Sequence, residues 1–131
     1  MITIKSNLVD AVWAAAKPPM PQAPVFVHDI KYSGLSVQEK FAKVTSKLAK
    51  KVDALLITTL DDIDWIVNLR GKDIKYNPVF FAYAIFLPAS GEESSKSTLQ
   101  LFITASKVAT EEVQAHIKEN GIEVYDYSDI T

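Results

Sequence analysis

The sequence of 131 residues contains no cysteine. Disulfides, thiolate zinc sites and cysteine nucleophiles are therefore excluded from its chemistry. The four glycines are scattered, so the sequence lacks the glycine-rich loops that bind phosphates and dinucleotides. It also lacks a charge excess of either sign, because 14 basic and 16 acidic residues give a net charge of −2. Without a basic excess we expect no nucleic-acid partner.

Long apolar runs are missing as well. The longest uncharged one, residues 78–89, has the length of a strand, whereas a membrane span needs about 20 apolar residues. The start of the chain does not follow the pattern of a signal peptide, since Asn7 and Asp10 interrupt it. We therefore expect a cytoplasmic chain with no membrane partner. Its length is sufficient for one domain with a hydrophobic core.

Proline is concentrated in one place, because Pro18, Pro19, Pro21 and Pro24 fall within seven residues. Such a segment is typical of an extended linker. The residues before it, 7–16, predict a short helix capped by Asn7, and residues 25–27 predict a short strand. We interpret residues 1–31 as a linker and short helix that lead from a missing first domain, and residues 32–131 as a single α/β domain.

A helix is predicted over residues 36–52. Ser36 and Glu39 have the spacing of a capping box. Apolar residues then recur every three or four positions, which defines one buried face: Val37, Phe41, Val44, Leu48 and Val52. Four lysines lie off that face and are predicted to be solvated: Lys40, Lys43, Lys47 and Lys50.

The remaining pattern predicts an α/β fold with a mixed central sheet flanked by helices. Four apolar runs indicate strands: 54–60, 79–87, 98–104 and 122–127. The run 54–60 is continuous, which is typical of a strand buried on both faces, so we expect Leu56 in the core. Two more helices are predicted, one ending at Gly71 as a left-handed cap and one over 110–120. The polar loop 88–97 should be the most disordered internal segment.

Two motifs follow one another in the middle of the chain. Their residues are Thr59, Leu60, Asp61, Ile63, Trp65, Asn68, Leu69, Arg70 and Gly71, then Asn77, Pro78, Val79, Phe80, Tyr83 and Ala84. They resemble the segments TxLDxIxWxxNLRG and NPVFxSYA in the middle domain of three-domain aminopeptidase P enzymes. Ala82 departs from the pattern, where a serine is common.

The resemblance implies a creatinase amino-terminal fold with a ribonuclease-H-like arrangement. It further implies a larger, homodimeric enzyme that removes the residue preceding proline from the N-terminus of peptides. That enzyme binds two divalent metal ions, usually manganese, in a C-terminal domain that this chain lacks. We therefore expect no catalytic residue, metal site or cofactor here.

The histidines and the acidic cluster were the other candidates for metal chemistry. His28 and His116 are too far apart for a local metal motif, and we interpret both as solvated. Asp61, Asp62 and Asp64 follow a strand, where a nuclease-like metal site is conceivable. The negative net charge favours the alternative, in which these carboxylates stabilise the start of a helix.

Arg70, Tyr76 and Asn77 are the candidate functional residues, because they lie on short polar connections. They could face substrate or a neighbouring domain; alternatively, Arg70 and Asn77 only fix the loop through bonds to the backbone. The hypothesis is thus a non-catalytic domain with a structural and substrate-restricting role. Its partners would be the enzyme's own catalytic domain and proline-containing peptides. A free-standing interaction module derived from such an enzyme is the alternative.

Overall fold

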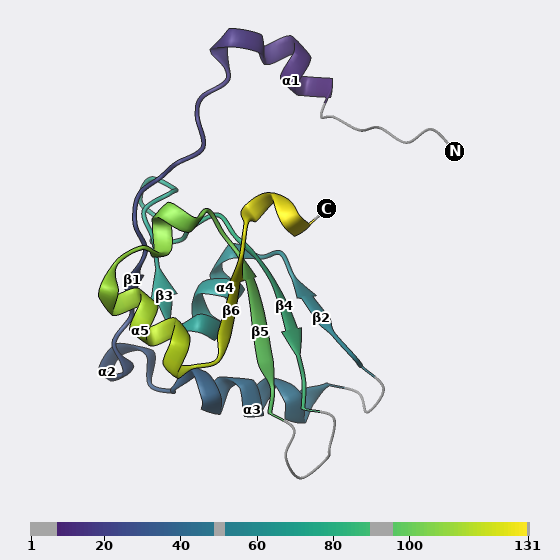
Figure 1. Ribbon diagram of the computed structural model, residues 1–131, viewed down its shortest axis with the longest axis vertical. Helices are drawn as coiled ribbons and strands as arrows, with labels where there is room; N and C mark the ends of the chain where they lie inside the picture. The colour runs from purple at the N-terminus through teal and green to yellow at the C-terminus, as the bar shows by residue number, and fades with distance from the viewer. Residues whose placement is uncertain (1–7, 49–51, 90–95, 131) are drawn as a thin grey trace.

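A four-stranded mixed sheet forms the centre of the molecule (Figure 1). The computed structural model describes residues 8–48, 52–89 and 96–130. The strands follow the order β2-β4-β5-β6, with bounds β2 Leu55–Ile57, β4 Tyr83–Leu87, β5 Thr98–Phe102 and β6 Ile122–Tyr125. The pairs β2–β4 and β4–β5 are antiparallel, and β5–β6 is parallel. All four predicted strands are confirmed with narrower bounds. The prediction of disorder for the loop 88–97 falls largely on residues 90–95, which lie outside the described residues.

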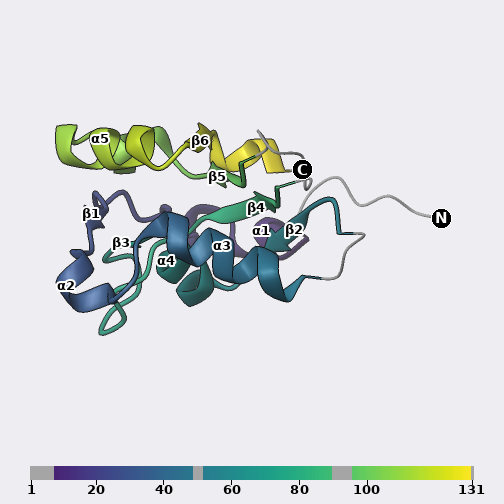
Figure 2. The ribbon, with the colours of Figure 1, turned by 90° about the horizontal axis from the view of Figure 1, so that it is seen from below.

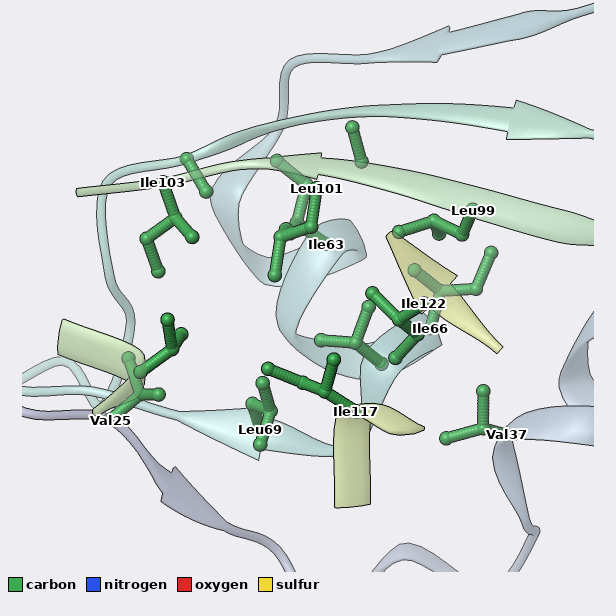
Figure 3. Close-up of a cluster of buried hydrophobic side chains, with 14 of the residues drawn as sticks. Val25, Val37, Ile63, Ile66, Leu69, Leu99, Leu101, Ile103, Ile117 and Ile122 are labelled. Atoms are coloured by element: carbon green, nitrogen blue, oxygen red, sulfur yellow. The ribbon is translucent and has the colours of Figure 1, made fainter. Parts of the chain in front are cut away.

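Three helices pack on one face of this sheet: α3 Val37–Lys47, α4 Leu60–Val67 and α5 Glu111–Glu119. The register aligns Phe86, Leu99 and Ile122 across three strands, and all three side chains are buried. Figure 3 shows Leu99 and Ile122 with Ile63 and Ile66 of α4 and Ile117 of α5 in one cluster. The predicted sheet flanked by helices is therefore confirmed.

The start of α3 agrees with the prediction, but its end and one lysine do not. The helix ends at Lys47 and not at residue 52, because Leu48 adopts extended backbone angles (φ −72°, ψ 147°), so Leu48 and Val52 do not belong to the helix. Ser36 and Glu39 form the predicted capping box at the start of the helix. Phe41 is 1% exposed, and its ring meets that of Phe86 edge-on at 5.2 Å. The prediction that Lys40 is solvated is wrong, because its side chain is fully buried. Its Nζ donates to the Trp65 oxygen on α4 and to Oδ1 of Asn68, the residue that ends α4.

The strand β2 is an edge strand and not a strand buried on both faces. Among the described residues β4 is its one partner strand, and Leu56 points away from the helices and is 56% exposed. The expected place of Leu56 in the core is therefore wrong. A continuous apolar run does not distinguish a central strand from an edge strand, because that depends on what else the chain puts beside it.

The end of α4 also differs from the prediction. Asn68, not Gly71, ends the helix in the left-handed conformation, with a φ of 52°. Asn68 tolerates this conformation better than most side chains. Gly71 is required for another reason: a Cβ there would lie 2.6 Å from Cβ of Phe80. The glycine therefore allows two backbone segments to approach each other closely.

The first two elements of the chain do not belong to the core. Helix α1 (Leu8–Trp13) and the 3₁₀ turn η1 (Ala14–Ala16) have no buried residue and lie away from the sheet (Figure 1). The predicted cap of this helix, Asn7, lies outside the described residues. From Val25 the chain joins the core, and β1 (Phe26–Val27) pairs with β3 (Leu69–Arg70). Three further short turns complete the fold: α2 Ile30–Ser33, η2 Ala105–Val108 and η3 Tyr127–Ile130.

Candidate functional site

Arg70 lies on β3 and is half-buried. Its Nη1 donates to the backbone oxygens of Asp64 and Leu69, each at 2.8 Å. These bonds satisfy carbonyls around the end of α4, so Arg70 holds the helix against β3. A guanidinium bound in this way has a structural role in addition to any contact that its exposed part makes.

Tyr76 and Asn77 form the tip of a tight turn after β3. The Asn77 N–H donates to the Ile74 oxygen at 3.1 Å, which closes the turn. Tyr76 has a φ of 66°, and its side chain is 94% exposed. A non-glycine residue in this conformation costs roughly 1–2 kcal/mol. The Lys75 ammonium lies 4.9 Å from the Tyr76 ring centre.

A shallow groove of about 340 Å³ lies beside this turn. Its lining residues are Phe26, Gly71, Lys72, Ile74, Lys75, Tyr76, Asn77 and Pro78. Two of the three predicted site residues therefore lie together on one surface. Arg70 is the neighbour of this surface in sequence but does not line the groove. The groove combines apolar side chains with two lysines.

A buried ion pair, which no local sequence pattern indicates, holds the loop 71–80 in place. Lys107 pairs with Asp73, and both side chains are at most 1% exposed. Oδ2 of Asp73, the oxygen that contacts Lys107, also accepts from the Phe81 N–H at 2.7 Å. The Asp73 N–H donates to the Val79 oxygen at 3.0 Å. Asp73 thus connects both ends of the loop to η2, 34 residues further along the chain.

Lys40 is buried among neutral acceptors at the end of α4. Its Nζ donates to the Trp65 oxygen at 2.7 Å and to Oδ1 of Asn68, and it lies 4.8 Å from the Trp65 ring centre. The Asn68 side chain in turn donates to the Leu35 oxygen at 2.9 Å. Burial, and secondly the Arg70 charge, lower the pKa of Lys40 to about 8.

Asp64 is the other unusual charge in this region. Its side chain lies on the buried side of α4, and neither carboxylate oxygen has a hydrogen-bond partner among the described residues. Burial raises the pKa of Asp64 to about 7, although the Arg70 charge acts in the opposite direction. The hypothesis that all three acidic residues stabilise the helix start is therefore wrong for Asp64. Asp61 and Asp62 do lie in the first turn and are exposed.

The three carboxylates do not converge. Within the described residues, no group of three or more aspartate, glutamate or histidine side chains could hold a metal ion. The histidines are not simply solvated either, because both are half-buried. The ring Nε2 of His116 lies 2.8 Å from the Val67 oxygen, and the backbone N–H of His28 donates to the Asn68 oxygen at 2.8 Å. Burial, then Arg70 and Lys40, lower the pKa of His28.

The comparison with known families agrees with this fold. The family model of the creatinase/prolidase N-terminal domain matches residues 16–131. The chain belongs to this family. It is 41% identical over 128 residues to a probable Xaa-Pro aminopeptidase P of Sordaria macrospora, covering 97% of this chain and 19% of that protein. For the Aspergillus fumigatus protein of the same name, the identity is 44% over 123 residues, covering 93% and 17%.

A solved structure agrees with the family assignment. X-prolyl aminopeptidase from Caenorhabditis elegans, described as a cytosolic enzyme with a di-nuclear active site, superposes with a TM-score of 0.84 at 32% identity. The match covers 98% of this chain and 20% of that one. The chain therefore spans about a fifth of the length of the proteins it resembles. No helix in the described ranges is long and apolar enough to cross a membrane.

Proposed function

We propose that this chain is the non-catalytic middle domain of an Xaa-Pro aminopeptidase, with a structural and substrate-restricting role. The observation that supports this proposal is that nearly all of this chain matches a small part of a longer enzyme. The match takes in 98% of this chain at a TM-score of 0.84 but only 20% of the C. elegans enzyme. The larger part of such an enzyme would hold its di-nuclear site.

In this proposal the larger enzyme removes the N-terminal residue that precedes proline, in the cytoplasm and as a homodimer. Its two divalent ions, manganese by the family resemblance, would bind in the catalytic domain. A dinuclear site needs several convergent carboxylates to offset the repulsion between two cations. Asp61 and Asp62 are exposed on α4 while Asp64 is buried on its other side, so this cluster does not fit the group.

Residues 1–31 would connect this domain to a preceding one, and residues 32–131 would form the domain itself. The last residues of the connector dock on the domain, because Val25 is buried and β1 pairs with β3. The exposed α1 would then belong to the surface of the preceding domain. Its apolar side chains support this, since Leu8 is 67% and Val12 is 87% exposed.

Tyr76 is the residue that we assign to the contact with substrate or catalytic domain. Its aromatic ring is almost fully exposed, yet the turn and the Asp73–Lys107 pair hold its backbone in place. A fixed, exposed tyrosine loses little entropy when it is covered. Asn77 closes the turn below it, and Arg70 anchors the strand that leads into the loop.

The free-standing interaction module remains the second candidate. The groove beside Tyr76 supports it, because apolar residues there are exposed in this chain on its own: Phe26 is 39% and Ile74 is 38% exposed. Such a module would bind a separate protein through the same surface.

Two assays test the proposal. The chain alone should not hydrolyse a fluorogenic Xaa-Pro peptide, and millimolar Mn²⁺ should leave its melting temperature unchanged, since a ligand of the folded state must stabilise it. Turnover, or a metal-dependent shift, would contradict a passive role.

In the longer enzyme, Tyr76→Ala should raise KM or change peptide selectivity, whereas Tyr32→Ala should not. Tyr32 is a matched control, because it is 72% exposed and also has a lysine beside its ring. Equal effects of the two variants would remove the assigned role of Tyr76.

A further inference from the structure

The sheet has an open edge at β2. This strand is the last in the order β2-β4-β5-β6, and no described strand pairs with its other side (Figures 1 and 2). Natural edge strands are usually protected by their shortness, a charged residue, a proline, a bulge or a covering element. β2 is short, with three residues, but it contains no charged residue and no proline, and its register with β4 is continuous. Among the described residues no strand pairs with its outer side, so the backbone groups on that side can pair with another extended chain.

A small apolar groove runs beside this edge. It measures about 270 Å³ and lies between β2 and the helices α3 and α4, lined by Val44, Trp65, Ile66, Asp62 and the residues 55–59. This volume is below the roughly 300–1,000 Å³ of typical small-molecule sites. It suits single side chains better. A strand added to β2 would direct every second side chain towards the helices, and thus into this groove.

The charge at the groove distinguishes between possible occupants. Asp62 is the one charged residue among the described residues that line it. Asp61 and Asp53 are exposed near the two ends of β2. If two copies of this chain joined at this edge, their carboxylates would approach one another, and like charges facing across strands are destabilising. The rim therefore favours a segment that carries positive charge.

We propose that β2 and the adjacent groove bind an extended polypeptide segment by strand addition. One apolar side chain of the segment would enter the groove, and a lysine or arginine beside it would pair with Asp62. The proposal does not depend on the proposed function, because it uses neither the loop 71–80 nor any catalytic domain.

The test uses the 131-residue chain with a synthetic peptide, acetyl-KTVLVTK-amide. Trp65 lines the groove and reports on its occupation, and Trp13→Phe removes the second of the two tryptophans. We expect a saturable change in Trp65 emission and slower amide exchange in β2. Asp62→Lys should weaken binding of this peptide at least tenfold and favour acetyl-ETVLVTE-amide instead. Glu112→Lys, a charge reversal in the first turn of α5, is the matched control and should leave both affinities unchanged.

A second pair of measurements can overturn the proposal. A peptide N-methylated at alternate residues cannot form the backbone ladder, so it should lose at least tenfold in affinity. Equal affinity of the methylated peptide, no binding at millimolar concentration, or no preference of the wild-type chain for the basic peptide would each contradict strand addition. Concentration-dependent self-association in sedimentation, if the basic peptide inhibits it, would assign the edge to a second copy and overturn the proposal as well.

Discussion

Two lysines are fully buried in the part of the chain that the structure describes, and their charges are accommodated in opposite ways. Lys107 faces a buried carboxylate, Asp73, in an ion pair that connects η2 to the loop 71–80. Lys40 has no acidic partner among the described residues; it donates to the neutral oxygens of Trp65 and Asn68 and lies over the Trp65 ring.

The difference concerns what each lysine would leave behind. Removal of Lys107 leaves an ionised carboxylate in the interior, whereas removal of Lys40 leaves two neutral acceptors and also removes a poorly solvated charge. Burial alone therefore does not predict which lysine costs more stability when it is replaced. The charge of the group that loses its lysine partner does, and this leads to four predictions.

The largest expected effect is that of Lys107→Met. It leaves Asp73 unpaired, and breaking a buried pair in this way typically costs about 3–5 kcal/mol. Urea unfolding at pH 7 measures this change in the free energy of unfolding. Adding Asp73→Asn should recover a large part of the loss. If the double variant is as unstable as the single one, the cost comes from packing and not from the unpaired charge.

Asp64→Asn should have the second largest effect, in the stabilising direction at pH 8. The folded protein binds a proton at Asp64 up to a pH of about 7, compared with an ordinary pKa of 3.8. The free energy of unfolding of the wild type should therefore fall as the pH rises from about 4 to about 7. Asp64→Asn has no carboxyl group at this position and therefore lacks this pH dependence. We expect equal stability near pH 4 and an advantage for the variant of about 1–3 kcal/mol at pH 8. An advantage that is the same at both pH values would contradict the titration of Asp64.

Lys40→Met should cost less than Lys107→Met. The two abandoned acceptors lose hydrogen bonds worth about 1 kcal/mol each, and the removal of a desolvated charge offsets part of that. We expect a net loss of about 1 kcal/mol in the same urea titration at pH 7. A loss equal to that of Lys107→Met would remove the distinction between the two lysines. Lys47→Met is the control, because Lys47 is exposed in the last turn of the same helix.

The last prediction is a pH dependence of that difference. In the folded state the pKa of Lys40 is about 8, below the ordinary 10.5. Between these values the unfolded chain binds more protons, so the free energy of unfolding of the wild type rises with pH. Lys40→Met lacks this rise. The wild type should therefore gain stability relative to the variant from about pH 8 to pH 10. A constant difference over this range would show that Lys40 titrates normally.

Much of the fold could be predicted from the sequence, because local periodicity carries it. The Ser36–Glu39 capping box and the spacing of Val37, Phe41 and Val44 locate α3 without reference to the rest of the chain. The position of β2 at the edge could not be predicted, since it depends on the order of the strands. Leu56 therefore looked like a core residue.

The site was less predictable, because its main contacts join residues that are distant in sequence. Lys40 is separated from Asn68 by 28 positions and Lys107 from Asp73 by 34. Nothing local distinguishes a buried lysine of this kind from a solvated one. The family resemblance pointed to Asn68 and Arg70, but it did not show that Asn68 accepts from a lysine or that Arg70 donates to the backbone oxygens of Asp64 and Leu69.

The contact between Gly71 and Phe80 limits how the loop 71–80 can diversify. The two ends of this loop meet backbone to backbone, with the Phe80 atoms where a Cβ of residue 71 would stand. Side chains therefore cannot adjust the spacing at its base. Insertions or larger residues there would separate the strand from the following segment and pull Asp73 from Lys107. Adaptation to new partners is confined to the tip around Tyr76, so a library for altered specificity should vary 74–77 and leave both ends of the loop unchanged.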